Sequence, residues 1–170
     1  MSYIELHACS AFSFLRGGSF PEQLAQTAAA LGMPAMALLD RDGVYGAQRF
    51  SVAARENGVR PIIGSELTME DGATLPVLVE NRNGYKNLCQ LLTQAHLRSE
   101  KGKCAVQWNE LPEFAEGLIA LLRCDAQNGL GSARASRAVS GALAVISSAP
   151  SISFGEAPTG PRLGACAPQN

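Results

Sequence analysis

Residues 35–42 read AMALLDRD, five apolar residues followed at once by three charged ones. A continuous apolar run of this length is typical of a parallel β-strand that is covered on both faces. In α/β sheets and barrels, the residues that do chemistry lie at the carboxyl ends of such strands. The stretch therefore predicts a buried strand that stops at Asp40 and places charged residues at a functional edge.

On the amino-terminal side, residues 3–6 predict a short strand that delivers His7 at its end. A capping box at Ser19 to Glu22 then predicts the start of a helix. The buried face of this helix is expected from residues at helical spacing, namely Leu24, Ala28 and Leu31. Gly32 follows at the position where a left-handed residue ends a helix.

On the carboxyl-terminal side, further apolar runs predict strands over residues 59–63, 75–79 and 117–122. Helices are expected over residues 47–57 and 85–96, the second with a buried face at Leu88, Leu91, Leu92 and Ala95. Strands that alternate with helices in this order predict an α/β fold with a parallel sheet or barrel.

Three ionisable side chains follow three different predicted strands, and they are His7, Asp40 and Glu66. If the strands are parallel, these side chains should converge at one mouth, with Cys9 nearby. Imidazole and thiolate favour zinc, and carboxylates also accept manganese or magnesium, so a divalent metal site is one interpretation. Polar groups that only satisfy hydrogen bonds at strand ends are the other.

Composition excludes several classes of protein. The 170 residues include 46% hydrophobic and 17% charged residues with a net charge of -1, so no overall basic field would hold nucleic acid. The five cysteines, at positions 9, 89, 104, 124 and 166, form no CxxC pair, and this favours a reduced cytoplasm over a disulfide framework. No apolar run is long enough to span a bilayer, so a soluble protein is expected.

Residues 123–170 differ in composition from the rest, because they are rich in Ala, Ser, Gly and Pro and carry few charges. Such a segment has little apolar surface to bury and predicts a disordered tail. A reading frame shifted near codon 123 would give the same composition. The expected organisation is therefore one domain over residues 1–122, followed by this tail.

Several motifs in residues 1–122 resemble one known family. They are ELHACSAFSFLRGGS at residues 5–19, LLDRDGVYGA at 38–47 and PIIGSE at 61–66, and residues 79–89, 91–97 and 108–121 show the same likeness. Together they resemble the N-terminal PHP (polymerase and histidinol phosphatase) domain of bacterial error-prone DNA polymerases, which are related to the polymerase III alpha subunit. The resemblance implies part of a distorted TIM-like barrel, truncated before any polymerase active site.

The resemblance also implies site residues, since PHP domains hold up to three metals for phosphoester hydrolysis. His7 matches the first histidine of an HxH pair and Glu66 matches a bridging glutamate. Cys9 stands where the second histidine is expected, and Arg41 replaces a histidine that follows Asp40. Because a permanent cation repels metal, we expect weak or absent binding of zinc or manganese at this vestigial site. Arg41 is expected either to form an ion pair with Asp40, Asp42 or Glu66 or to point to solvent.

The implied function is that of a fragment of an error-prone DNA polymerase that serves in DNA replication and damage-tolerant synthesis. Its implied partners are DNA and other polymerase or mutasome components, although this segment shows no clear surface for nucleic acid and no catalytic residue. Two alternatives stay open. One is a metal-dependent phosphoesterase or exonuclease-like hydrolase, and the other is a non-functional product of a broken gene.

Overall fold

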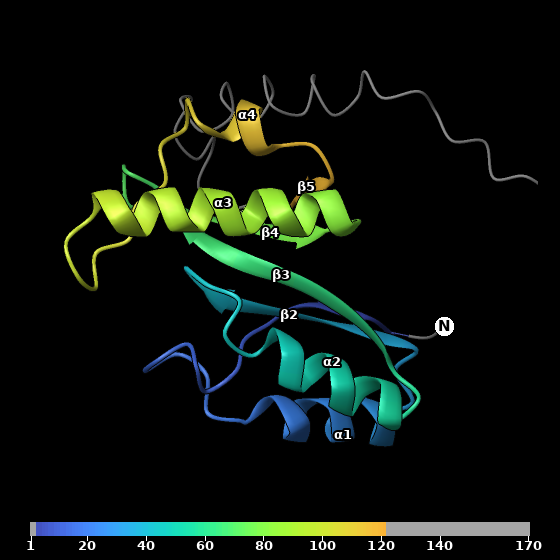
Figure 1. Ribbon diagram of the computed structural model, residues 1–170. Helices are drawn as coiled ribbons and strands as arrows, with labels where there is room; N and C mark the ends of the chain where they lie inside the picture. The colour runs from blue at the N-terminus through green and yellow to red at the C-terminus, as the bar shows by residue number, and fades with distance from the viewer. Residues whose placement is uncertain (1–2, 122–170) are drawn as a thin grey trace, which may run out of the picture.

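The computed structural model describes residues 3–121, which form one mixed α/β unit (Figure 1). The elements in chain order are β1 (Glu5–Ala8), α1 (Pro21–Ala30), β2 (Ala35–Arg41), α2 (Ala47–Glu56), β3 (Arg60–Thr68), β4 (Thr74–Val79), α3 (Arg82–Arg98), α4 (Leu111–Phe114) and β5 (Leu118–Ala120). The predicted tail at residues 123–170 lies outside the described residues. In the described part, no helix is both long and apolar enough to cross a bilayer.

The five strands form one sheet in the order β1-β2-β3-β4-β5. β1, β2 and β3 are parallel, as predicted, and α1 and α2 make the crossovers between them. β4 and β5 are antiparallel to their neighbours, so the prediction of a wholly parallel sheet is wrong for these two strands. β3 and β4 are joined by a tight turn in which the Met69 amide donates to the Ala73 carbonyl at 2.8 Å, and this leaves no room for a crossover helix.

The register of the sheet shows that all the longer helices cover the same face. Leu38 pairs with Ile63 in one row, and Leu67 pairs with Leu75 in another. Their members on β3, Ile63 and Leu67, are four residues apart, and side chains an even number of residues apart in a strand lie on the same face of the sheet. α1 and α2 cover this face at β2, and α3 covers it at β4, with β3 between them (Figure 1).

Two apolar clusters fill the space between the helices and this outer face. The first joins α3 and α4 to β3 and β4, and its buried members include Leu67, Val77, Leu88, Leu91, Leu92, Ala95 and Phe114. The second joins α1 and α2 to β2, and its buried members include Ala25, Ala28, Met36, Leu38, Phe50 and Ala54. The four residues predicted as the buried face of α3 are therefore confirmed.

The opposite face of the sheet is concave. Leu39 and Leu78 lie in one row with Gly64 between them, and they form a small buried cluster with Ala37. A Cβ on Gly64 would lie 2.2 Å from the Val77 carbonyl oxygen and 3.0 Å from Leu39 Cγ. Leaving this position without a side chain lets the two leucines meet as the sheet curls. This curl with helices outside is the wall of a partial barrel, as the predicted fold class requires.

The start of α1 differs from the prediction. The N-cap is Phe20, one residue later than expected, and it has no side chain that can accept from the helix. Gln23 closes this end instead, because its Oε1 accepts from the Phe20 amide at 2.9 Å. The expected Ser19 to Glu22 box is therefore wrong. Pro21 at the first helical position already has a helical φ, which explains why the helix starts there.

The end of α1 is as predicted. Gly32 has a φ of 67°, and the amide of Met33 donates to the Ala28 carbonyl at 2.9 Å. This is the Schellman arrangement that a left-handed residue after the helix allows. Leu31, which helical spacing places in the core, is instead 66% exposed, and Ala25 occupies the buried position.

The close packing at Gly64 gives a stability prediction. Gly64→Ala should lower the free energy of unfolding by about 1–3 kcal/mol, because the new methyl group meets backbone in a packed interior. Chemical denaturation of the full chain followed by circular dichroism measures this. Gly18→Ala is the matched control, since a Cβ there has no neighbour within 4 Å, and it should leave stability unchanged. Equal stability of the two variants would contradict the packing described here.

Candidate functional site

A cavity of about 350 Å³ lies at the carboxyl ends of β1, β2 and β3. Its lining comes from the strands, at His7, Leu39, Arg41 and Glu66, and from the loop after β1, at Cys9, Ser13 and Arg16. The cavity therefore lies where parallel strands present polar groups together. The structure brings three of the four predicted site residues to this cavity, and they are His7, Cys9 and Glu66.

Glu66 is the polar centre of the cavity. His7 Nε2 lies 2.8 Å from Glu66 Oε2, and Arg16 Nη1 lies 3.6 Å from Glu66 Oε1. The glutamate side chain is largely buried, whereas those of His7 and Arg16 are about half exposed. Both carboxylate oxygens thus already face a nitrogen from the protein.

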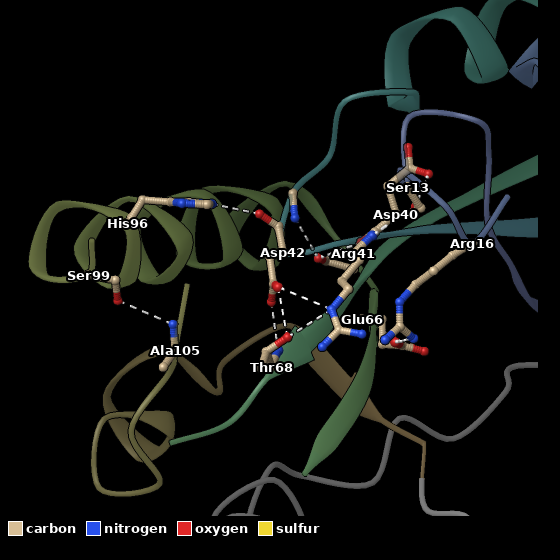
Figure 2. Close-up of polar contacts among 12 residues, drawn as sticks. Ser13, Arg16, Asp40, Arg41, Asp42, Glu66, Thr68, His96, Ser99 and Ala105 are labelled. Atoms are coloured by element: carbon tan, nitrogen blue, oxygen red, sulfur yellow. Dashed lines mark hydrogen bonds and ion pairs between the residues drawn. The ribbon is translucent and has the colours of Figure 1, made fainter. Parts of the chain in front are cut away.

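Arg41 enters the same cavity from β2, because it pairs in register with Glu66 on β3. Its Nε donates to Thr68 Oγ1 at 3.1 Å and lies 3.5 Å from Asp42 Oδ2. The expected ion pair therefore exists, and its partner is Asp42. Figure 2 shows Arg41 turned toward Asp42 and Thr68, and Arg16 turned toward Glu66. Arg41 Nη1 is buried without a hydrogen-bond partner among the described residues.

Asp40 does not join this group. Its side chain is 1% exposed and lies on the outer face of β2, since neighbouring residues of a strand point to opposite faces. Oδ1 accepts from the Ser10 amide at 2.9 Å and from the Ser10 and Ser13 hydroxyls at 2.8 Å each, and Oδ2 accepts from the Gly46 amide at 2.9 Å. The expected convergence of Asp40 with His7 and Glu66 is therefore wrong.

Cys9 is a half-buried thiol with negative charge near it. Burial raises the pKa of its thiol above the ordinary value, and the negative charges of Asp40 and Glu66 raise it further. A raised thiol pKa keeps the sulfur protonated at neutral pH, whereas metals bind the thiolate. In residues 3–121, no three His, Cys, Asp or Glu side chains lie close enough to hold a metal together.

Asp42, which the sequence offered as one of three ion-pair partners, and two further residues complete the surroundings of Arg41. Asp42 has a φ of 50° and accepts from both the amide and the hydroxyl of Thr68 at 2.7 Å. His96, at the end of α3, binds the Asp42 carbonyl oxygen through Nε2 at 2.7 Å. Neighbouring residues of a strand point to opposite faces of the sheet. This rule, applied to residues 39–42, was the signal that places Asp40 and Arg41 on different faces.

A larger cavity of about 530 Å³ lies between α3 and α4. Its lining includes Tyr85, Cys89 and Thr93 from α3 and Glu113 and Phe114 from α4. All of its lining comes from these two helices, and none comes from the carboxyl ends of β1, β2 and β3. The cavity at the strand ends is therefore the stronger candidate for a site.

The PHP domain family matches residues 5–146 of this chain. An error-prone DNA polymerase from Pseudomonas fluorescens is 41% identical over 133 residues, which cover 78% of this chain and 13% of that protein. One from Dechloromonas aromatica is 47% identical over 113 residues, which cover 66% of this chain and 11% of that protein. The chain thus spans only a small part of the length of these relatives.

Among solved structures, an amidohydrolase from Chromobacterium violaceum, with bound sulfate and no metal, has a similar fold. The TM-score is 0.60 with 15% identity, and the match covers 84% of this chain and 74% of that one. At this identity the likeness concerns the fold alone.

The four hydrogen bonds to Asp40 give a second stability prediction. Asp40→Ala should cost about 3–5 kcal/mol of folding free energy, because several buried donors lose their partner at once. Thermal and chemical unfolding of the full chain measures this. The control is Glu100→Ala, which removes an exposed carboxylate paired only with Lys103 and should change stability by less than about 0.5 kcal/mol. Similar stability of the two variants would contradict a structural role for Asp40.

The raised pKa of Cys9 predicts slow alkylation. At pH 8 the thiolate fraction of Cys9 should be below that of an ordinary cysteine, so iodoacetamide should modify it slowly, with a rate that still increases above about pH 9. Site-resolved mass spectrometry of the full chain measures the rate, with a short unstructured cysteine peptide in the same solution as the comparison. Glu66→Gln should speed the reaction at Cys9 alone, since it removes one of the negative charges. A Cys9 rate that levels off below pH 8 would overturn this assignment.

Proposed function

The chain belongs to the PHP domain family, and from this membership we propose that it is part of the PHP region of an error-prone DNA polymerase, where it acts as a scaffold and not as a hydrolase. Polymerase relatives matched over most of this chain support the first part. The nucleotidyl transfer, the DNA contacts and the mutasome partners then belong to the intact polymerase. Its setting is the cytoplasm, in replication and repair of damaged DNA.

The position of Arg41 carries the second part of the proposal. Arg41 and Glu66 are register partners on the concave face, so a permanent cation lies beside the carboxylate that the family resemblance assigns to metal. A guanidinium cannot lose its proton near neutral pH and offers no lone pair to a metal. The residues at this position therefore do not suit a divalent ion.

The remaining candidate ligands support the same conclusion. Glu66 is held by His7 and Arg16, and the carboxylate oxygens of Asp40 accept four hydrogen bonds on the other face. Burial and nearby negative charge raise the pKa of the Cys9 thiol, so a metal would have to displace its proton. A metal would have to displace several of these contacts to find three ligands.

A scaffold role agrees with the way that the side chains are used. Hydrogen bonds from the end of β2 to other segments use the side chains of Asp40, Arg41 and Asp42. Neither aspartate lines the cavity. Nucleotidyl transfer needs carboxylates that hold two metals about 4 Å apart. Residues 3–121 contain no such group, so the polymerase chemistry is assigned to other parts of the intact protein.

One observation favours a second candidate, a phosphoester hydrolase. His7 and Glu66 lie 2.8 Å apart at the mouth of a cavity, and such a pair could exchange a proton with a bound substrate. This candidate needs something to polarise the phosphate, which a metal would supply in a hydrolase of this kind. The two functions therefore differ in metal content and in turnover.

We predict that the full chain, purified without chelator, carries far less than one zinc or manganese ion per molecule. Inductively coupled plasma mass spectrometry measures the metal. With manganese or zinc added, turnover of p-nitrophenyl phosphate should equal that of His7→Ala, because no metal centre forms. A stoichiometric bound ion, or turnover that His7→Ala abolishes, would overturn the scaffold function.

The control for this experiment is the double variant Cys9→His/Arg41→His. It removes the cation and supplies the two imidazoles that the family motif has at these positions. Its bound metal should rise above that of the unchanged chain, which would show that the measurement can detect a site here. If the double variant binds no more metal than the unchanged chain, Arg41 is not what keeps metal out of this site, and the explanation based on its charge is wrong.

A further inference from the structure

The loop between β1 and α1, residues 9–20, exposes an unusual amount of apolar surface. Phe14 is 83% exposed and Leu15 is 89% exposed, and they are neighbours at the tip of the loop. Phe12 and Phe20 in the same loop are about half exposed. A contiguous apolar patch on a protein surface marks an interaction site more often than a single exposed residue does.

This tip is held in a defined shape. The amides of Arg16 and Gly17 both donate to the Ser13 carbonyl, at 2.9 Å and 3.1 Å, and close a turn around Phe14 and Leu15. The Ser13 hydroxyl in turn donates to buried Asp40. The two apolar side chains are therefore presented by a fixed turn that is tied to the core of the domain.

Leu15 adopts a φ of 60°, in the left-handed region that favours glycine. A leucine there costs folding free energy that a glycine would not. Two glycines follow closely, at positions 17 and 18, yet the strained position carries a large apolar side chain that contacts solvent. Folding gains little from this exposed leucine, and its whole side chain is available to a partner.

The charge of the loop indicates the kind of partner. Residues 9–20 contain three Phe, one Leu and a single charged residue, Arg16. Beside them, Arg49 lies over the rings of Phe12 and Phe20 at 5.5 Å and 5.7 Å, and its own charge is paired with Glu22. Nucleic acid would require several free cations that track the phosphates. Aromatic rings, an aliphatic side chain and a lone arginine are instead the composition of a protein-interface centre.

We propose that Phe14 and Leu15 are the anchor by which this PHP segment docks into an apolar pocket on the remainder of the polymerase. The inference rests on the proposed function, since it takes the partner to be the long part of the relatives that this chain does not match. That part makes up most of their length, because the matched segment is 10–13% of each of them.

Photocross-linking tests this directly. The full chain would carry p-benzoylphenylalanine at position 14, a close substitute for phenylalanine, and would be mixed with the Pseudomonas fluorescens polymerase expressed without its own matched segment. The control position is Leu97 at the end of α3, which is also apolar and also 83% exposed. We expect cross-links from position 14 to apolar residues of the polymerase, and few from position 97.

Binding of the unmodified chain to the polymerase, measured by biolayer interferometry, distinguishes a failure of the anchor from a failure of the proposed function. If the chain binds the polymerase but position 14 cross-links no better than position 97, the anchor is wrong and the proposed function stands. If the chain does not bind at all, the proposed function fails and the anchor with it. Cross-links to a second copy of the chain, or to an added single-stranded oligonucleotide, would also overturn the anchor.

Leu15→Gly gives a second test that misfolding cannot imitate. Glycine relieves the left-handed strain, so the melting temperature of the full chain should stay the same or rise, while affinity for the polymerase should fall about tenfold or more, as for a hot-spot residue. Leu97→Ala should leave the affinity unchanged. A Leu15→Gly variant that binds as tightly as the unchanged chain would exclude a docking role for this side chain.

Discussion

The buried carboxylate of Asp40 is the interaction on which the described structure depends. An anion this deep is costly unless its oxygens are fully used, and here they accept four hydrogen bonds. Three of the donors belong to Ser10 and Ser13 in the loop after β1, and the fourth is the Gly46 amide before α2. One side chain thus joins the end of β2 to the two loops beside it. The Ser13 hydroxyl also accepts from the Arg41 amide at 3.0 Å. Contacts around Asp40 therefore help to fix the backbone of Arg41, whose side chain lines the cavity.

Side chains alternate between the two faces of the sheet along β2, so its charged residues lie in two different environments. Asp40 points into the packed outer layer and Arg41 points into the concave cavity, although they are adjacent in sequence. Arg41 places a positive charge in that cavity, and its partner is Asp42 and not Glu66. Within residues 3–121 its Nη1 donor finds no partner, a loss of about 1–3 kcal/mol for such a group. The two faces of this strand end thus hold their charges with different partners, Asp40 with backbone and hydroxyl donors and Arg41 with Asp42 and Thr68.

Much of this fold could be predicted from the apolar pattern, and the errors have a common physical cause. The run at residues 35–39 predicted β2, and helical spacing predicted the buried face of α3, because both signals depend on a single element. The antiparallel direction of β4 and the position of Asp40 on the outer face depend instead on how strands and helices pair with one another. The Asp71 and Gly72 pair before β4 was a local sign of a hairpin. The use of Ser10 and Ser13 as partners of Asp40 had no such sign, since hydroxyl residues of a loop have many alternative partners.

The buried anion also explains why a strained turn can persist at the surface. A leucine in the left-handed region costs roughly 1–2 kcal/mol, and an isolated loop would relax to avoid it. Here the loop is attached to Asp40 through Ser10 and Ser13, so relaxing the turn would also expose a buried anion and break its hydrogen bonds. Because losing those bonds costs more free energy than the strain at Leu15, the turn keeps its shape. A loop held in this way has already lost its conformational freedom on folding, and a partner that binds it does not have to order it again.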